Sequence, residues 1–159
     1  MRIMYDVNDI FALPRNGSDA VCVTTNGMVR RDGRAVMGRG IAKTADQRFG
    51  LAYTLAEYLG KYGNRVFNMG IRRDSATGKA MRIFTFPTKH DWRDPSDLEL
   101  IKQSARQLVA QCDRLHVSTC YLTCPGCANG RLDWETQVRP VLEPILDDRF
   151  VIADSALKP

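Results

Sequence analysis

The sequence lacks the features of membrane and secreted proteins. No apolar run approaches the roughly 20 residues that a membrane helix needs, and the N-terminal segment Met1–Asp6 has no apolar signal core. The five cysteines are an odd number, and four of them lie between Cys112 and Cys127, which does not suit a secreted disulfide framework. We therefore expect a cytoplasmic protein that does not act at a membrane.

Two common nucleotide-binding signatures are also missing. The glycine-rich segment Gly33–Gly40 has neither the Lys-Ser/Thr ending of a P-loop nor the GxGxxG spacing of a dinucleotide-binding turn. The 159 residues, 44% hydrophobic and 26% charged, have the composition of an ordinary globular protein. Their number and the absence of a linker predict one domain over residues 1–159.

The order of apolar segments predicts an α/β domain. Strands are expected at 2–5, 20–25, 65–69, 81–86, 116–122 and 149–153, and helices at 41–49, 51–62, from 94 and from 133. Asp94 and Pro95 are suited to begin the third helix, whose apolar residues recur on one face. Alternating strands and helices indicate a layered domain with a largely parallel or mixed sheet.

Two glycine-rich loops directly follow expected strands. Gly38 and Gly40 stand just before a helix, and Gly126 and Gly130 follow the strand that ends near Leu122. Glycine permits close approach of the backbone to a ligand, and the N–H groups of a helix N-terminus attract anions. Because ligands gather at the carboxyl ends of such strands, the two loops can clamp a diphosphate from both sides.

Positive charge is concentrated in one short stretch. Arg30–Arg48 holds six basic and two acidic residues, a net charge of +4 in a chain whose total is +5. Such a patch attracts phosphate-bearing ligands, including nucleic acid. The alternative is an ordinary solvated face.

Five segments occur together in an order that resembles the macrodomains. They are Asn8–Phe11, Thr25-Asn26, Met37–Ala42, Phe86–Lys89 with the following x-x-Trp-Arg-x-Pro-Ser-x-Leu, and Gly126–Glu135. The resemblance runs from about Asp9 to Val151 and is strongest to the branch that contains the DarG antitoxins and the terminal ADP-ribose glycohydrolases. It implies a three-layer α/β/α fold with a central mixed sheet.

The resemblance also implies a set of site residues for ADP-ribose. Asp9 would accept a hydrogen bond from the adenine amino group with Ile10 beside the base, and Asn26 would bind the distal ribose. The first phosphate loop would comprise Gly38, Arg39, Gly40 and Ile41, and the second Gly126, Cys127, Ala128, Asn129 and Gly130. Arg131, which follows the second loop, would also bind the ligand. Lys89 falls at the position of the catalytic lysine of these relatives.

The sequence departs from the relatives at three places. Gly130 stands where the terminal glycohydrolases have an aspartate, whereas the DarG proteins have glycine, so the DarG type is the better guide. The segment Gly27–Ala35 is longer than in either relative. The last strand offers Ala153 and Asp154 where an aromatic residue often closes the adenine site.

Several residues near these loops have competing interpretations. Cys124 and Cys127 form a C-x-x-C preceded by His116 and Cys120, but a strand over 117–122 would separate these side chains, so no metal is expected. His90, next to Lys89, is either structural or a general acid or base. Trp134 is expected to pack in the core behind the second loop, with a ligand-facing position as the alternative.

The expected function is removal of ADP-ribose from a modified macromolecule by hydrolysis at C1″ of the distal ribose. Nucleic acid is among the expected substrates, and no cofactor is expected. A module that binds ADP-ribose without cleaving it and a phosphatase acting on ADP-ribose 1″-phosphate are the alternatives. Lys89 favours the glycohydrolase.

Overall fold

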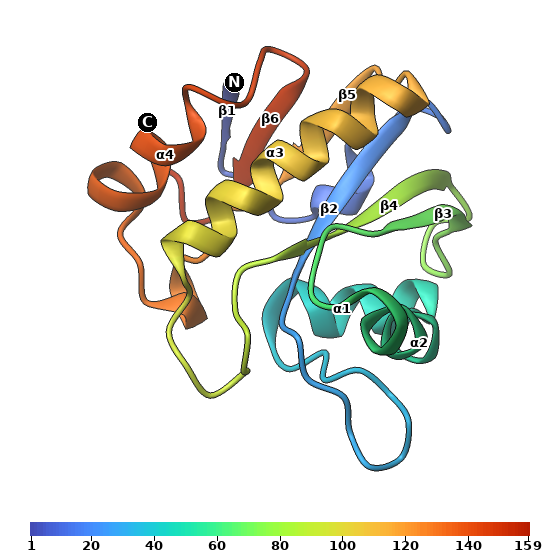
Figure 1. The fold of residues 1–159 in the computed structure, drawn as a ribbon. Helices are drawn as coiled ribbons and strands as arrows, with labels where there is room; N and C mark the ends of the chain where they lie inside the picture. Colours follow the sequence, from blue (N-terminus) through green and yellow to red (C-terminus); the bar gives the residue numbers. More distant parts are fainter.

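The computed structural model describes residues 1–159 and contains one mixed six-stranded sheet (Figure 1). The strands are β1 (Arg2–Tyr5), β2 (Asp19–Thr25), β3 (Asn68–Arg73), β4 (Ala80–Pro87), β5 (Thr119–Leu122) and β6 (Phe150–Asp154). Their order is β1-β6-β5-β2-β4-β3, and every neighbouring pair is parallel except β3 with β4. The expected mixed sheet is confirmed.

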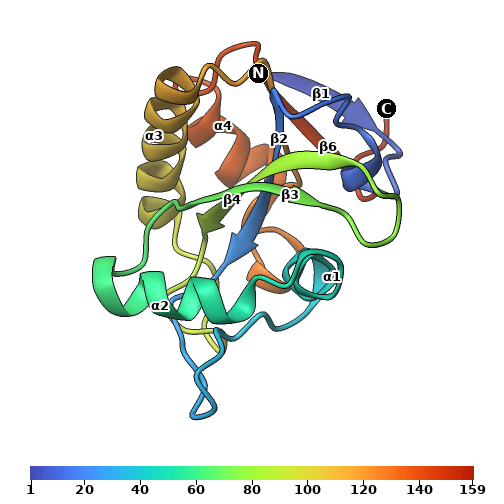
Figure 2. The same cartoon turned by 90° about the vertical axis from the view of Figure 1, so that its right-hand side faces the viewer.

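Helices cover both faces of the sheet. They are α1 (Gly40–Phe49), α2 (Ala52–Tyr62), α3 (Leu98–Leu115) and α4 (Arg139–Leu142), with one-turn helices at η1 (Ile10–Ala12), η2 (Ala128–Gly130) and η3 (Trp134–Val138). Figures 1 and 2 show α3 and α4 together, away from the pair α1 and α2. No helix in the structure combines the length and the hydrophobicity that a membrane-spanning helix requires.

The alternation of side chains along β2 explains the three layers. Val21 and Val23 pack in the cluster that includes residues of α1 and α2, whereas Ala20 and Cys22 pack in the cluster that includes residues of α3 and α4. Successive side chains of a strand point to opposite faces. A strand that is covered on both faces therefore needs the continuous apolar run seen in the sequence.

Three expected starts of helices or strands are wrong. Strand β5 begins at Thr119 rather than His116, because His116 is the C-cap of α3. Helix α3 begins at Leu98 with Asp97 as its cap, not at Asp94, because the N–H of Ser96 donates to the Gly130 carbonyl at 3.0 Å and is used outside the helix. Strand β3 begins at Asn68 rather than Arg65. The N–H of Phe67 donates to the side-chain hydroxyl of Thr85, so regular pairing with β4 starts later.

Candidate functional site

The loops that follow the parallel strands leave the sheet at the same edge. Because β1, β2, β4, β5 and β6 are parallel, their carboxyl ends meet there. These loops bring together the residues that the sequence singled out: Asp9, Ile10, Asn26, Gly38, Arg39, Gly40, Ile41, Lys89, Gly126, Cys127, Ala128, Asn129, Gly130 and Arg131.

The first glycine loop leads into an uncapped helix N-terminus. Gly38 and Gly40 adopt positive φ angles of 56° and 63°, a conformation that side chains disfavour. The residue before the helix, Arg39, gives no side-chain cap. The N–H groups of the first turn of α1 therefore remain available to an anion.

The second glycine loop packs too tightly for side chains. A Cβ atom at Gly126 would lie 2.6 Å from Ile101 Cδ1, and one at Gly130 would lie 2.2 Å from Ser96 Oγ. The loop is closed by a bond from the N–H of Leu132 to the Gly126 carbonyl at 3.0 Å. An aspartate in place of Gly130 would collide with Ser96, so the absence of a second-loop carboxylate has a packing reason.

The two loops face each other. A Cβ atom on Gly40 would lie 3.7 Å from Asn129 Nδ2, so the start of α1 and the second loop are in near contact. The N–H groups of Ala128 and Asn129 donate to no other part of the chain. Unpaired backbone donors from two loops therefore converge on one place, which suits a diphosphate.

Lys89 lies beside the second loop. Its Nζ donates to the carbonyl of Asn129 at 3.2 Å and, more weakly, to that of Trp92 at 3.4 Å. Partial burial lowers the pKa of Lys89, and the positive charge of Arg131 lowers it further. The amine is therefore more easily deprotonated than an ordinary lysine.

A cavity of about 440 Å³ opens on the side of the first loop that is closer to β6. Asp9, Ile10 and Ile41 line it, together with Ala153 and Asp154 of the last strand. The last strand supplies no aromatic wall, as the sequence indicated. Asp154 instead accepts a hydrogen bond from the N–H of Cys124 at 3.0 Å and so holds the start of the second loop.

Arg48 is a cavity residue that the sequence did not single out. It lies in α1, and its Nη1 is 2.9 Å from Asp9 Oδ1. Its guanidinium also pairs with Asp74, which is fully buried and whose pKa it lowers to about 2. Arg48 therefore positions Asp9 and is not part of an exposed basic face. No local pattern marks this role, because 39 residues separate Arg48 from Asp9.

Asn26 ties together the two ends of the long segment after β2, at Met28 and Val36. Its Nδ2 donates to the Val36 carbonyl and its Oδ1 accepts from the N–H of Met28, both at 3.0 Å. The segment Gly27–Ala35 forms a hairpin with a single β-bridge between Val29 and Ala35. Figures 1 and 2 show the hairpin reaching away from the body. The ribose contact expected of Asn26 stays a prediction.

The side chains next to Lys89 are held by polar contacts with nearby residues. His90 Nε2 lies 3.0 Å from Asp97 Oδ2 at the start of α3. Asp91 pairs with Arg93 at 2.6 Å, and this bond lowers the pKa of Asp91 to about 2. Asp91 is therefore ionised near neutral pH, and Lys89 is the neighbouring group with a lowered basicity.

The cysteines form no metal site. All five are free thiols, and no group of three or more His, Cys, Asp or Glu side chains is placed to hold an ion. Cys22 and Cys120 are in contact in the core, with their sulfur atoms 3.4 Å apart. Trp134 is also buried in this part of the core, behind the second loop.

Known proteins with similar sequences share one name. No protein-family model matches the chain. DNA ADP-ribosyl glycohydrolase from Mycobacterium tuberculosis is 32% identical over 101 residues, which are 63% of this chain and 29% of the relative. The protein of that name from Thermus aquaticus is 40% identical over 52 residues, 33% of this chain and 14% of the relative. The chain thus spans less than a third of the length of these relatives.

Solved structures show the same fold over nearly the whole chain. Thermosipho africanus DarTG in complex with ADP-ribose gives a TM-score of 0.75 at 19% identity, covering 99% of this chain and 43% of the other. The macrodomain of Mycobacterium tuberculosis DarG gives a TM-score of 0.68 at 23% identity, covering 98% of both. The chain therefore has the macrodomain fold, and it is similar in sequence and fold to macrodomains of the DarG type.

Proposed function

We propose that this chain binds ADP-ribose across the two glycine loops and hydrolyses ADP-ribosyl adducts. The observation that carries the proposal is the convergence of the loops beside Lys89. The free N–H groups at the start of α1 and in the second loop suit the diphosphate. The cavity lined by Asp9 and Ile10 suits the adenosine. The distal ribose would then extend toward Lys89, next to Asn129.

Lys89 is the proposed catalytic group. Burial and Arg131 lower its pKa. When neutral, the amine can attack C1″ and displace the carrier, and water then hydrolyses the bond to the lysine; when charged, it can protonate the departing group while water attacks C1″. The second loop offers no carboxylate to share this work, because Gly130 stands against Ser96. Asp91 is engaged by Arg93. The reaction therefore depends on the lysine.

We further propose nucleic acid as the carrier of the ADP-ribose. The relatives from Mycobacterium tuberculosis and Thermus aquaticus are named DNA ADP-ribosyl glycohydrolases. In this chain Arg30, Arg34 and Lys43 line a second pocket of about 250 Å³ together with Gly38 and Asp46, and both arginines also pair with Asp32. Cations at this place can bind the phosphates of a strand whose modified base enters the site.

One set of assays tests the proposal. Wild type and Lys89→Ala are incubated with ADP-ribosylated DNA, ADP-ribosylated protein and ADP-ribose 1″-phosphate, and released ADP-ribose and phosphate are measured. We expect cleavage of the DNA adduct, a loss of at least roughly 100-fold in turnover for Lys89→Ala, and little change in its affinity for ADP-ribose. Binding without cleavage of any adduct would identify a non-catalytic reader. Release of phosphate alone would identify a phosphatase.

A further inference from the structure

An exposed tryptophan lies next to the lysine. Trp92 is 52% exposed, whereas the other tryptophan of the chain, Trp134, is 8% exposed. Lys89 Nζ donates to the main-chain carbonyl of Trp92 at 3.4 Å. The indole side chain takes no part in that contact. Neither the fold nor the proposed chemistry of Lys89 therefore explains why a large apolar ring faces water here.

The loop that carries Trp92 is tied to three parts of the molecule. The His90 carbonyl accepts the N–H of Gly27 at 3.0 Å, at the base of the hairpin. The Lys89 carbonyl accepts Asn64 Nδ2 at 2.9 Å. The N–H of Ser96 reaches the second glycine loop. A ring on so well anchored a loop is pre-organised, so contact with a ligand costs little conformational entropy.

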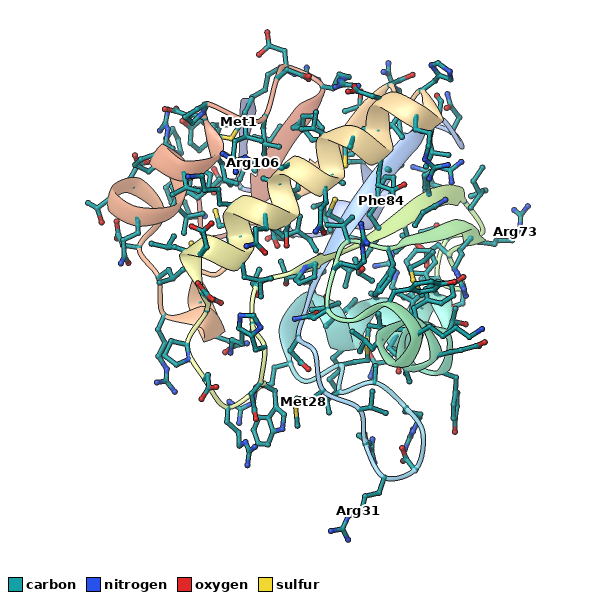
Figure 3. All side chains as sticks on the ribbon, in the orientation of Figure 1. Met1, Met28, Arg31, Arg73, Phe84 and Arg106 are labelled. Atoms are coloured by element: carbon teal, nitrogen blue, oxygen red, sulfur yellow. The ribbon has the colours of Figure 1, made fainter.

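The surroundings of Trp92 are charged, with residues of both signs, and only sparsely apolar. The Arg93 guanidinium lies 5.9 Å from the centre of the indole ring and is anchored to Asp91. On the neighbouring hairpin only Val29 is also an exposed large apolar residue. Figure 3 shows Met28 close to the lowest part of the loop between β4 and α3, and Arg31 farther out on the hairpin.

This composition favours one kind of ligand. A stable protein interface usually buries about 800 Å² on each partner around an apolar centre, and two exposed apolar side chains do not make such a centre. An isolated, exposed aromatic ring beside an arginine is typical of sites that stack nucleobases. A membrane surface would require a larger apolar face.

We propose that Trp92 is a stacking platform for a nucleobase of the ADP-ribosylated strand, and that it favours nucleic-acid adducts over protein adducts. The inference rests on the proposed function: if ADP-ribose binds as proposed, the base attached to its C1″ projects out of the site beside Lys89, close to Trp92. Both faces of a base in a duplex are covered by its neighbours, so the base must come from a single strand or be extruded.

Kinetics of three variants test the platform. For Trp92→Ala we expect KM for an ADP-ribosylated oligonucleotide to rise roughly 5- to 100-fold, the range for loss of one base–aromatic stack. Its kcat and its affinity for free ADP-ribose should stay near wild type, because the carbonyl that contacts Lys89 is retained. Trp92→Phe should recover most of the loss. Tyr62→Ala, which removes another exposed aromatic ring, is the matched control and should not change KM.

Fluorescence provides a test that does not depend on cleavage. An unmodified single-stranded oligonucleotide should quench the emission of wild type, and the quenching should disappear in Trp92→Phe, in which only the buried Trp134 remains. Persistent quenching in Trp92→Phe, or an unchanged KM in Trp92→Ala, would overturn the platform. If wild type cleaves no adduct, the proposed function fails, and the quenching result alone decides the role of Trp92.

Discussion

Gly40→Glu is the substitution that probes the paired loops most directly. Gly40 has a φ of +63°, and a Cβ there would lie 3.7 Å from Asn129 Nδ2. The new side chain would therefore start in the narrow space between the two loops. If the diphosphate binds there, a carboxylate would both occupy its place and repel it.

The size of the effect follows from the geometry. Two unit charges about 5 Å apart repel by about 3 kcal/mol at an effective dielectric constant of about 20, which is a factor of more than 100 in affinity. The positive φ adds a strain of about 1 to 2 kcal/mol for any side chain. That strain is equal in the free and bound protein, so it lowers stability and leaves affinity unchanged.

Two further variants separate charge from strain. Gly40→Ala carries the strain without the carboxylate. Gly50→Glu places the same side chain at the other end of α1, at a φ of +67° with no atom within 4 Å of its Cβ, about 15 Å away. Calorimetry with ADP-ribose should show a loss above 100-fold only for Gly40→Glu and near wild-type affinity for Gly50→Glu. Unchanged binding by Gly40→Glu would refute the diphosphate site.

Three other predictions follow from the charges of the chain. The folded-state pKa of Asp74 is about 2, against an ordinary 3.8. About 2 kcal/mol of folding stability is therefore present above pH 4 and is lost as the pH falls toward 2. In urea unfolding, Asp74→Asn should be less stable than wild type at pH 7 and should not show this loss of stability in acid. Reversing the charges of Arg30 and Arg31 should weaken binding of modified DNA and flatten its salt dependence without affecting free ADP-ribose, whereas Arg106→Glu on α3 (Figure 3) should do neither; equal salt slopes for both ligands would mean a merely solvated face. Arg131→Gln removes a cation that lowers the pKa of Lys89, so the Lys89-controlled limb of the pH dependence of kcat should move to higher pH; an unmoved limb would contradict the role of Lys89.

The sequence determined the layers and the edge of the sheet at which the two glycine loops gather. The continuous apolar run of β2 required cover on both faces, and the structure places one helix pair on each. The spacing of Ile101, Ala105 and Leu108 placed one face of α3 in the core, where all three are buried. Glycines directly after two strands indicated loops at one edge of the sheet. These features were predictable because strand and helix periods are local properties of the chain.

The exact start of α3 was decided by contacts distant in sequence. Asp94 and Asp97 are both residue types that cap helices, and local rules favoured the first because Pro95 follows it. The bonds from the N–H groups of Ser96 and Asp97 to the carbonyls of Gly130 and Thr88 hold these residues outside the helix. The cap at Asp97 therefore depends on where the second glycine loop lies.

Only the tertiary structure decided which side chains work together. The pairing of Arg48 with Asp9 spans 39 residues and that of Lys89 with Asn129 spans 40. No period in the sequence reports such a distance. Arg48 counted as one more cation of a basic stretch until the fold placed it beside two carboxylates. Helices and strands can be predicted from local patterns. The site, however, is formed by loops at the ends of several strands, and these come together only when the strands take their final order in the sheet.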